Sequence, residues 1–557
     1  MAWQTSNWKW FERCQTRLMN RQAFPWLAHY QAGVSPGIDY PLISLSQMLE
    51  DTVEKYPTNV ALVFQGVKIT YSALVNMANR LATGLYEMGV RKGDRVAVML
   101  PNCPQWVISY YAVLKLGAVL VQTNPMYVER ELEHQLKDSG SKVIIVLDSL
   151  YPRVKNIRDH TPLQQVVCVS FTETAAIDNT LSFEALLKDY PASPPEVEIS
   201  PMEDVAVFQY TGGTTGVSKG VMLTHYNLVA NAYQVRCWMP MCNEGQERIL
   251  TVLPLFHIYS LTACNNLSVL LGGAQYLMPR FDINSMLQVI NDFKPTIFPG
   301  APTMYIAMIN HPRIADYDVK SIRMCISGSA PLPLEVSERF YRLTGGYLVE
   351  AYGLSEASPA THLNPLGGED RAGSIGLPAP DTEARIMDME TGKDEMPVGQ
   401  VGELVVRGPQ VMKGYWNMPR ETSAVLRDGW LYTGDMAKMD EDGYFYIVDR
   451  KKDIIIAGGF NIYPREVEEV LYEHPKVQEA VVIGVPDPYR GETVKAFLVL
   501  RPGMSASPEE ITAYCREKLA SFKIPQLIEF RESLPKTAVG KILRRALREL
   551  EQEAKQN

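Results

Sequence analysis

Apolar residues are spaced in two different ways along the chain, and the change of spacing divides the sequence. Between about residues 59 and 350, short runs that are apolar on both faces, such as VAVML at 96–100 and VIIVL at 143–147, alternate with amphipathic stretches. Strands buried on both faces are typical of parallel sheets covered by helices. The pattern predicts doubly wound sheets, whose first strands and helices we expect at 60–64, 71–89, 95–100, 106–116, 118–122 and 142–147.

Beyond residue 380 the pattern changes to short β-segments separated by turn residues, expected at 384–386, 402–406 and 444–448. The charged run Asp449-Arg450-Lys451-Lys452-Asp453 follows, where a large body gives way to a small one. Charge runs are usually solvated turns, and the position of this one also suggests a hinge. Beyond it, a compact α/β unit is predicted, with helices at 464–473 and 508–520.

The chain is therefore predicted to be an α/β protein of several parts, because 557 residues exceed a single ordinary core. We expect an N-terminal arm at 1–35 and a large N-terminal domain at 36–449, with a small β-rich subdomain at about 380–449. A mobile α+β C-terminal lid domain is expected at 450–557, with the hinge near 449–453.

Composition excludes several classes of protein. With 46% hydrophobic and 21% charged residues, the bulk of the chain is not disordered. A net charge of -9 disfavours nucleic-acid binding as the main activity. Eight scattered cysteines without a CxxC pair predict free thiols in a reducing compartment. The sequence contains no run of about 18 uncharged apolar residues, so no membrane span is predicted. We therefore expect a cytoplasmic protein.

The first 26 residues have their own character, because they hold four of the eight tryptophans and several cations but few acids. A short helix at 8–19 would place aromatic rings beside cations, as in a segment that touches the inner face of a membrane. The alternative is an arm packed on the first domain through its tryptophans. The aromatic stripe is short and imperfect, which favours the packed arm over peripheral membrane contact.

The strongest local signal for chemistry is the run YTGGTTGVSKG at 210–220, directly after an apolar strand. Glycines let backbone N–H groups turn toward an anion, hydroxyls add donors and a lysine adds charge. Lys219 precedes Gly220 and no Ser or Thr follows, so the run is not a P-loop. It predicts a polyphosphate cradle made by Thr211, Gly212, Gly213, Thr214, Thr215, Gly216 and Lys219.

Three weaker motifs follow in order. In YGLSE at 352–356, Tyr352 can stack on a purine and Glu356 can hold Mg²⁺, although such an acid is by default a surface residue. In WLYTGD at 430–435, Asp435 can accept ribose hydroxyls or can simply lie in a β-turn. In LPKTAVGK at 534–541, a loop with Pro and Gly presents Lys541 before a helix expected at 542–550. For Arg544 and Arg545 on that helix we expect only basic decoration.

Together the four motifs resemble, in kind, order and rough spacing, those of the acyl-adenylate-forming superfamily. That superfamily includes acyl-CoA synthetases, firefly-type luciferases and the adenylation domains of peptide synthetases. The resemblance covers about residues 45–545. Four further stretches are similar to bacterial long-chain fatty-acid–CoA ligases in particular: Thr123–Tyr127, Arg130–Leu136, Pro254–Tyr259 and Val448–Asp453.

The resemblance implies roles toward ATP and Mg²⁺. The 211–220 segment would wrap the β- and γ-phosphates, Glu356 would ligate Mg²⁺, and Lys541 would bridge the substrate carboxylate and the α-phosphate. Catalytic roles would fall to Lys541, Glu356 and Thr211. Adenine would be framed by Gly328, Ser329, Ala330, Tyr352 and Gly353, and ribose would be held by Asp435 and Arg450.

The resemblance also implies sites for the acyl chain and for coenzyme A. The acyl pocket would lie near His257, Gly300 and Thr303, although most apolar residues of these segments are ordinary core. Rotation of the C-terminal domain about Lys452 would bring the segment with Gly458, Gly459 and Asn461 to the pantetheine chain.

The implied function is activation of a long-chain fatty acid by ATP to acyl-AMP, then thioester formation with coenzyme A, with release of pyrophosphate and AMP. The alternatives are a medium-chain or aryl acid–CoA ligase, an enzyme that loads a carrier protein, and a nucleotide-sensing scaffold without catalysis. The presence of both Glu356 and Lys541 argues against the scaffold. A homodimer is a further hypothesis.

Overall fold

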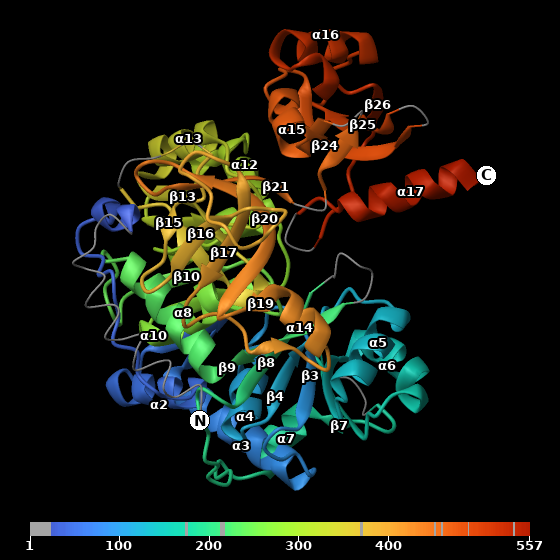
Figure 1. Ribbon diagram of the computed structural model, residues 1–557. Helices are drawn as coiled ribbons and strands as arrows, with labels where there is room; N and C mark the ends of the chain where they lie inside the picture. The colour runs from blue at the N-terminus through green and yellow to red at the C-terminus, as the bar shows by residue number, and fades with distance from the viewer. Residues whose placement is uncertain are drawn as a thin grey trace. The chain divides into compact units, whose positions relative to one another are not determined.

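The computed structural model describes residues 24–172, 177–211, 218–367, 371, 373–450, 453–457, 460–487, 490–537 and 541–556. These form two compact units, each with its own sheets and helices (Figure 1). The first unit extends to Glu383 and also includes Arg407–Leu431; the second consists of Ala384–Val406 and the chain from Tyr432 onward. The helix predicted at 8–19 and the predicted hinge residue Lys452 lie outside the described residues.

An eight-stranded sheet organises the lower part of the first unit in Figure 1. Strands β3, β4, β5, β6 and β8 are parallel neighbours, as the doubly apolar runs predict. The predicted strands and helices of this region are confirmed to within two residues. The strand order is β18 (Gly414–Tyr415), β9 (Lys219–Thr224), β8 (Val205–Thr211), β4 (Val119–Gln122), β3 (Arg95–Met99), β5 (Val143–Leu147), β6 (Gln165–Val169) and β7 (Leu181–Ser182).

Helices bury both faces of this sheet. One face packs on Leu132 and Leu136 of α5 (Glu129–Ser139) and on α6 (Tyr151–Ile157). The other carries α4 (Pro104–Lys115), which contacts α3 (Tyr71–Glu87), and α3 in turn contacts α7 (Phe183–Asp189). Helix α4 is apolar on all sides because it is buried all round. Its neighbour α3 begins where the Thr70 side chain accepts a hydrogen bond from the Ala73 amide.

A second set of strands forms the upper part of the first unit. Parallel bridges from Ile249 to Ile297 and from Ile297 to Met324 join two four-stranded sheets edge to edge. The first sheet runs β10 (Arg248–Thr251), β11 (Ala274–Leu277), β1 (Val60–Phe64) and β2 (Val67–Thr70). The second runs β12 (Met324–Ser327), β13 (Tyr347–Gly353), β14 (Ala360–Leu363) and β15 (Leu377–Pro378). Strands β10, β12 and β13 therefore end at one common edge.

The remaining helices of the first unit lie around these strands. Helix α8 begins at a capping box, in which Thr224 and Asn227 exchange hydrogen bonds between side chain and backbone. Helices α11, α12 and α13 pack into one apolar core with β10 and β12. The longer helices are α2 (Leu45–Lys55), α8 (His225–Trp238), α11 (Ile283–Phe293), α12 (Pro302–Ile309), α13 (Leu334–Thr344) and α14 (Pro419–Val425).

The second unit contains a β-rich part followed by an α/β part. The first sheet orders β16 (Glu383–Met387), β17 (Gly402–Arg407) and β20 (Trp430–Met439), with β21 (Phe445–Arg450) paired to β20. The short β19 (Leu426–Arg427) pairs with Trp430 and Leu431 at the start of β20, and these residues belong to the first unit. The second sheet orders β23 (Phe460–Ile462), β22 (Ile455–Ala457), β25 (Gly491–Leu500) and β24 (Val477–Asp487), with β26 (Leu527–Phe530) on β25. The helices are α15 (Pro464–Tyr472), α16 (Pro508–Lys518) and α17 (Arg544–Gln556).

The division between the units differs from the boundary expected near 449, because most of the β-rich region groups with the C-terminal part. Hydrogen bonds explain this grouping. Asp449 at the end of β21 accepts the backbone N–H of Arg465 at the start of α15, at 2.8 Å. The Arg544 guanidinium of α17 lies 3.6 Å from the same carboxylate. Strand β21 is thus tied to two C-terminal helices.

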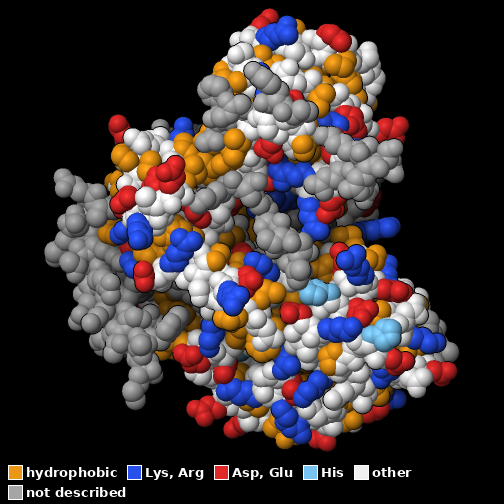
Figure 2. Space-filling model, turned by 45° about the vertical axis from the view of Figure 1, so that its right-hand side comes forward, with side chains coloured by type: hydrophobic (Ala, Val, Ile, Leu, Met, Phe, Trp, Pro, Cys, Tyr) orange, Lys and Arg blue, Asp and Glu red, His pale blue; other side chains and the backbone are white. Residues whose placement is uncertain are grey.

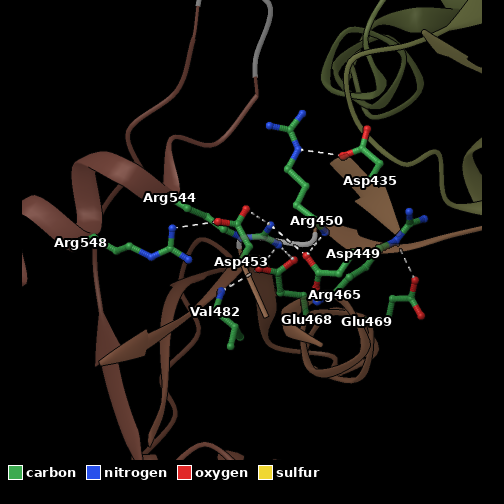
Figure 3. Close-up of polar contacts among 10 residues, drawn as sticks. All are labelled: Asp435, Asp449, Arg450, Asp453, Arg465, Glu468, Glu469, Val482, Arg544 and Arg548. Atoms are coloured by element: carbon green, nitrogen blue, oxygen red, sulfur yellow. Dashed lines mark hydrogen bonds and ion pairs between the residues drawn. The ribbon is translucent and has the colours of Figure 1, made fainter. Parts of the chain in front are cut away.

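Arg544 is the centre of a buried ionic network (Figure 3). Its Nη2 lies 2.8 and 2.7 Å from the two carboxylate oxygens of Glu468, and Nη1 lies 3.4 Å from Asp453. Arg548 adds an ion pair to Asp453 at 2.8 Å. Burial opposes the charged form of Arg544, but its ion pairs with Glu468, Asp449 and Asp453 outweigh this and raise its pKa. The expectation of basic decoration is therefore wrong for Arg544.

Arg545, by contrast, has a side chain 55% exposed that pairs with Glu549 one turn along α17, as expected for surface decoration. Figure 2 likewise shows Lys and Arg interspersed with Asp and Glu over most of the visible face. Within the described ranges, no helix is both long and apolar enough to cross a membrane.

Replacing Arg544 with Met should destabilise the second unit by about 3–5 kcal/mol, because Glu468 would keep a buried charge without its partner. Arg545→Met is the matched control and should change stability by no more than about 0.5 kcal/mol. Hydrogen exchange of the α15 and β24 peptides, followed by mass spectrometry, measures both. Equal protection in the two variants would contradict a structural role for Arg544.

Candidate active site

The predicted polyphosphate cradle begins and ends on a β-hairpin. Thr211 closes β8 and Lys219 opens β9, and the two residues pair directly across the antiparallel ladder. The Ser218 hydroxyl donates to the carbonyl of Thr211 at 2.8 Å and ties the two strand ends together. A P-loop connects a strand to a helix, whereas this run connects two strands. The structure therefore agrees with the prediction that the run is not a P-loop. The cradle residues Gly212, Gly213, Thr214, Thr215 and Gly216 lie outside the described residues.

Helix α5 supports the base of this hairpin. The Tyr210 hydroxyl donates to the Asp138 carboxylate at 2.6 Å, and the Trp416 indole N–H donates to the Asp138 carbonyl at 2.9 Å. His134 Nε2 lies 3.4 Å from the carbonyl of Ser218. The family-like stretch at 130–136 therefore lies beside the cradle, a role that its sequence alone did not reveal.

Glu356 lies close to the same hairpin, and Tyr415 makes the connection. The Tyr415 hydroxyl donates to Glu356 Oε1 at 2.8 Å, and the Nζ of Lys219 lies 5.0 Å from the centre of the Tyr415 ring. Burial, together with the negative charge of Glu356, raises the pKa of Tyr415, which stays a neutral donor. Sequence reasoning missed Tyr415, because nothing in its local run signals a partner near residue 356.

The surroundings of Glu356 fit a magnesium ion. Mg²⁺ is usually bound by one or two carboxylates together with substrate phosphates and water, rather than by a cage of protein ligands. Among the described residues, no cluster of three or more His, Cys, Asp or Glu side chains could hold a metal. Glu356 is half-buried, and of its two carboxylate oxygens only Oε1 accepts a hydrogen bond from the described residues, namely from Tyr415. One carboxylate oxygen thus stays available to a cation held mainly by phosphates.

The predicted adenine residues lie at the common edge of β12 and β13. Gly328, Ser329 and Ala330 follow β12, and Tyr352 lies near the end of β13, whose Glu350 pairs with Ser327 of β12. The Glu350 carboxylate accepts the Leu332 amide at 2.8 Å and holds the 328–332 loop. Only glycine fits at position 353, because a Cβ there would lie 2.3 Å from the carbonyl oxygen of Pro359.

Two tyrosines hold the segments predicted to form the acyl pocket. The Tyr259 hydroxyl donates to the Ile326 carbonyl at 2.6 Å and lies 3.4 Å from the Gly300 carbonyl. The Tyr305 hydroxyl also donates to Ile326, at 3.0 Å. These hydrogen bonds hold Tyr259, with the segment that precedes it, next to Gly300 and the end of β12. Sequence reasoning did not single out either tyrosine.

The predicted pocket residues themselves differ in their settings. His257 Nδ1 accepts the backbone N–H of Tyr259 at 3.3 Å and caps the short helix α9 (Ile258–Ser260), a structural role of its own. Thr303 is exposed on α12. A π-helical turn, η4 (Leu261–Asn266), follows α9, and Thr262 donates from it to the carbonyl of Ser358 at 2.5 Å. Such turns are frequent at functional sites.

Asp435 and Arg450 come together in the second unit. They pair across β20 and β21, and Arg450 Nε lies 3.2 Å from Asp435 Oδ1 (Figure 3). Lys541 is exposed at the end of its loop, where its backbone N–H donates to the Thr537 hydroxyl at 3.1 Å. Asn461 lies on β23 opposite Ile456. Gly458, Gly459 and Lys452 lie outside the described residues.

A separate cavity of about 740 Å³ opens at the opposite ends of the upper strands. It is lined by Arg248 at the start of β10, Ala274 at the start of β11, and Arg323, which precedes β12. The predicted adenine residues and Gly300 lie toward the carboxyl ends of the upper strands instead. This cavity is therefore no part of the candidate site.

The chain is similar in sequence to a known family and to known enzymes. Residues 49–416 match the model of the AMP-binding enzyme family, and residues 466–541 match the AMP-binding enzyme C-terminal domain. A long-chain-fatty-acid–CoA ligase of Bacillus subtilis (strain 168) is 51% identical over 95% of this chain and 98% of its own length. An enzyme of the same name from Escherichia coli O6:H1 is 40% identical, over 94% and 98%.

A solved structure extends the similarity to the fold. The anthranilate CoA ligase AuaEII, in complex with anthranoyl-AMP, superposes with a TM-score of 0.85 at 30% identity, covering 93% of this chain and 99% of that one. The family match alone spans more than half of the sequence and includes the cradle, the YGLSE motif and Tyr415. The chain therefore belongs to the AMP-binding enzyme family, whose members are acyl-adenylate-forming enzymes.

Proposed function

We propose that the protein is a long-chain fatty-acid–CoA ligase. It uses ATP to convert the fatty acid to acyl-AMP and pyrophosphate, and then transfers the acyl group to coenzyme A with release of AMP. The observation that carries this proposal is the 51% identity, over almost the whole chain, to a curated ligase of that name. An aryl acid is the second candidate substrate, because the structurally similar AuaEII is named an anthranilate ligase.

In the first half-reaction an oxygen of the fatty-acid carboxylate attacks the α-phosphorus of ATP, and the bond to pyrophosphate breaks. Both reactants are anions, so the protein must offset their repulsion most strongly in the transition state. Lys541 would supply positive charge to the carboxylate and the α-phosphate, and the cradle with Thr211 and Lys219 would hold the β- and γ-phosphates. Mg²⁺ held by Glu356 would neutralise charge on the triphosphate.

We assign the binding of the nucleoside to two sets of residues. Gly328, Ser329, Ala330, Tyr352 and Gly353 would frame the adenine, which the shared edge of β12 and β13 supports. Asp435 would accept hydrogen bonds from the ribose hydroxyls, with Arg450 holding its carboxylate at 3.2 Å. The fatty acid would lie near His257, Gly300 and Thr303.

In the second half-reaction the sulfur of coenzyme A attacks the acyl carbon of the mixed anhydride, the thiol proton is lost and AMP leaves. We propose that the lid at 450–557 rotates about Lys452 between the two steps, so that Lys541 withdraws. The segment containing Gly458, Gly459 and Asn461 would then line the path of pantetheine, since small residues leave room beside a thin ligand.

A substrate panel tests the proposed specificity. Purified protein is given ATP, coenzyme A and, one at a time, short- to long-chain fatty acids, aryl acids or amino acids. AMP and thioester are quantified. We expect kcat/KM to be highest for long-chain fatty acids. A preference for aryl acids would favour the second candidate, and acyl-AMP with released pyrophosphate, but without thioester, would indicate a carrier protein as acceptor.

Glu356→Ala should reduce magnesium-dependent turnover on the order of 100-fold or more, the cost of losing a preorganised electrostatic contact. The protein should stay folded and its melting temperature should fall only slightly, because Glu356 is half-buried and its loss removes one hydrogen bond, that from Tyr415. The rate is measured across a magnesium titration. Glu338→Ala removes a surface acid paired with Arg342 on α13 and serves as the control. Normal rates in Glu356→Ala would make Glu356 an ordinary surface acid.

The two half-reactions should separate in two variants. Lys541→Ala should lose acyl-AMP formation by on the order of 100- to 1000-fold, yet still make thioester from presynthesised acyl-AMP and coenzyme A. Gly459→Leu should block thioester formation and leave pyrophosphate release nearly normal. Pyrophosphate release and thioester detection follow the halves separately. Equal loss of both halves in each variant, at unchanged melting temperature, would refute the two-conformation proposal.

A further inference from the structure

The segment 412–416 joins the predicted metal ligand to the predicted phosphate cradle. On one side, the Met412 amide donates to the backbone carbonyl of Glu356 at 2.8 Å. On the other, the segment forms β18 and pairs antiparallel with β9, with Tyr415 opposite Val221. The Trp416 amide donates to the Gly220 carbonyl at 2.8 Å. One short stretch of chain is thus hydrogen-bonded to both elements.

The side chain of Tyr415 repeats this connection. Its hydroxyl reaches Glu356 Oε1 at 2.8 Å, while its ring lies 5.0 Å from the ammonium of Lys219. The residue is only 7% exposed, and the Tyr415 amide donates to Thr422 Oγ1 at 2.9 Å. A tyrosine fixed at both its backbone and its hydroxyl has little freedom to turn. It can therefore hold a flexible glutamate in one orientation.

We propose that Tyr415 is the positioning residue for the Mg²⁺ carboxylate. By holding Oε1, it directs Oε2 of Glu356 toward the cation and keeps that carboxylate in register with Lys219 and the triphosphate. This inference rests on the proposed function, in which Glu356 binds Mg²⁺ on ATP. Groups that orient a metal-binding side chain typically contribute about 10- to 100-fold to metal affinity.

Tyr415→Phe isolates the hydroxyl, because it keeps the ring beside Lys219 and the buried volume. Mn²⁺, as a spectroscopic probe for Mg²⁺, is titrated into the full-length protein saturated with a non-hydrolysable ATP analogue, and free Mn²⁺ is read by electron paramagnetic resonance. The Kd for Mn²⁺ should rise about tenfold in the variant. An unchanged Kd would overturn the proposal.

Tyr71→Phe is the matched control. Its hydroxyl is buried in the same unit and donates to the carbonyls of Ser268 and Gly273, at 3.0 and 2.7 Å. Its loss should lower the melting temperature without moving the Mn²⁺ curve. If Tyr71→Phe weakened Mn²⁺ binding as much as Tyr415→Phe, the effect would be a general loss of stability, and the positioning role would be refuted.

A double-mutant cycle distinguishes positioning from a direct role. Because Tyr415 is proposed to act through Glu356, Tyr415→Phe should change the Kd by less than about twofold in the Glu356→Ala background. A persistent tenfold effect there would overturn the proposal. The proposed function fails in a different way: wild-type protein would then form neither AMP nor thioester with any acid of the panel, whatever the Mn²⁺ titration gives.

Discussion

Parallel alignment of β10, the 297–300 segment, β12 and β13 is the constraint on which the candidate site depends. Parallel strands end at one edge, so the segments that follow them are neighbours however far apart they lie in sequence. Here that edge gathers the 328–330 loop, Tyr352 and Gly300. Tyrosine hydroxyls then fix these segments to one another through backbone carbonyls. The sheet therefore supplies proximity, and the buried tyrosines make the geometry precise.

Much of the fold was predictable because its signals are local. Runs apolar on both faces indicate buried parallel strands, and the glycine-rich run at 210–220 predicts a phosphate cradle, of which Thr211 and Lys219 pair across a β-hairpin. The partners of Tyr415, Tyr210 and Arg544 were not predictable in this way. Tyr415 and Glu356 are 59 residues apart, Tyr210 and Asp138 are 72 apart, and Arg544 and Glu468 are 76 apart. Only the folded chain brings these pairs together.

The interpretation of Arg544 as decoration failed for a physical reason. Helix α17 is strongly amphipathic, and from its sequence Arg544 and Arg545 look alike. Their difference lies in what each meets: three carboxylates within the fold for Arg544, and a neighbouring turn of helix for Arg545. A buried charge is tolerated only where opposite charges receive it. The sequence shows that both residues are charged, but only the fold shows that Arg544 is buried among carboxylates while Arg545 is exposed.

The second unit is built from two separated stretches, since the chain leaves it after Val406 and returns at Tyr432. During synthesis, β16 and β17 emerge before their partner strand β20 exists, and well before the core of β24 and β25. Strands β16 and β17 therefore remain exposed, without β20, while the intervening residues are synthesised. The same arrangement limits recombination in evolution: the unit cannot be exchanged between relatives as one contiguous piece of gene, because both stretches must move together.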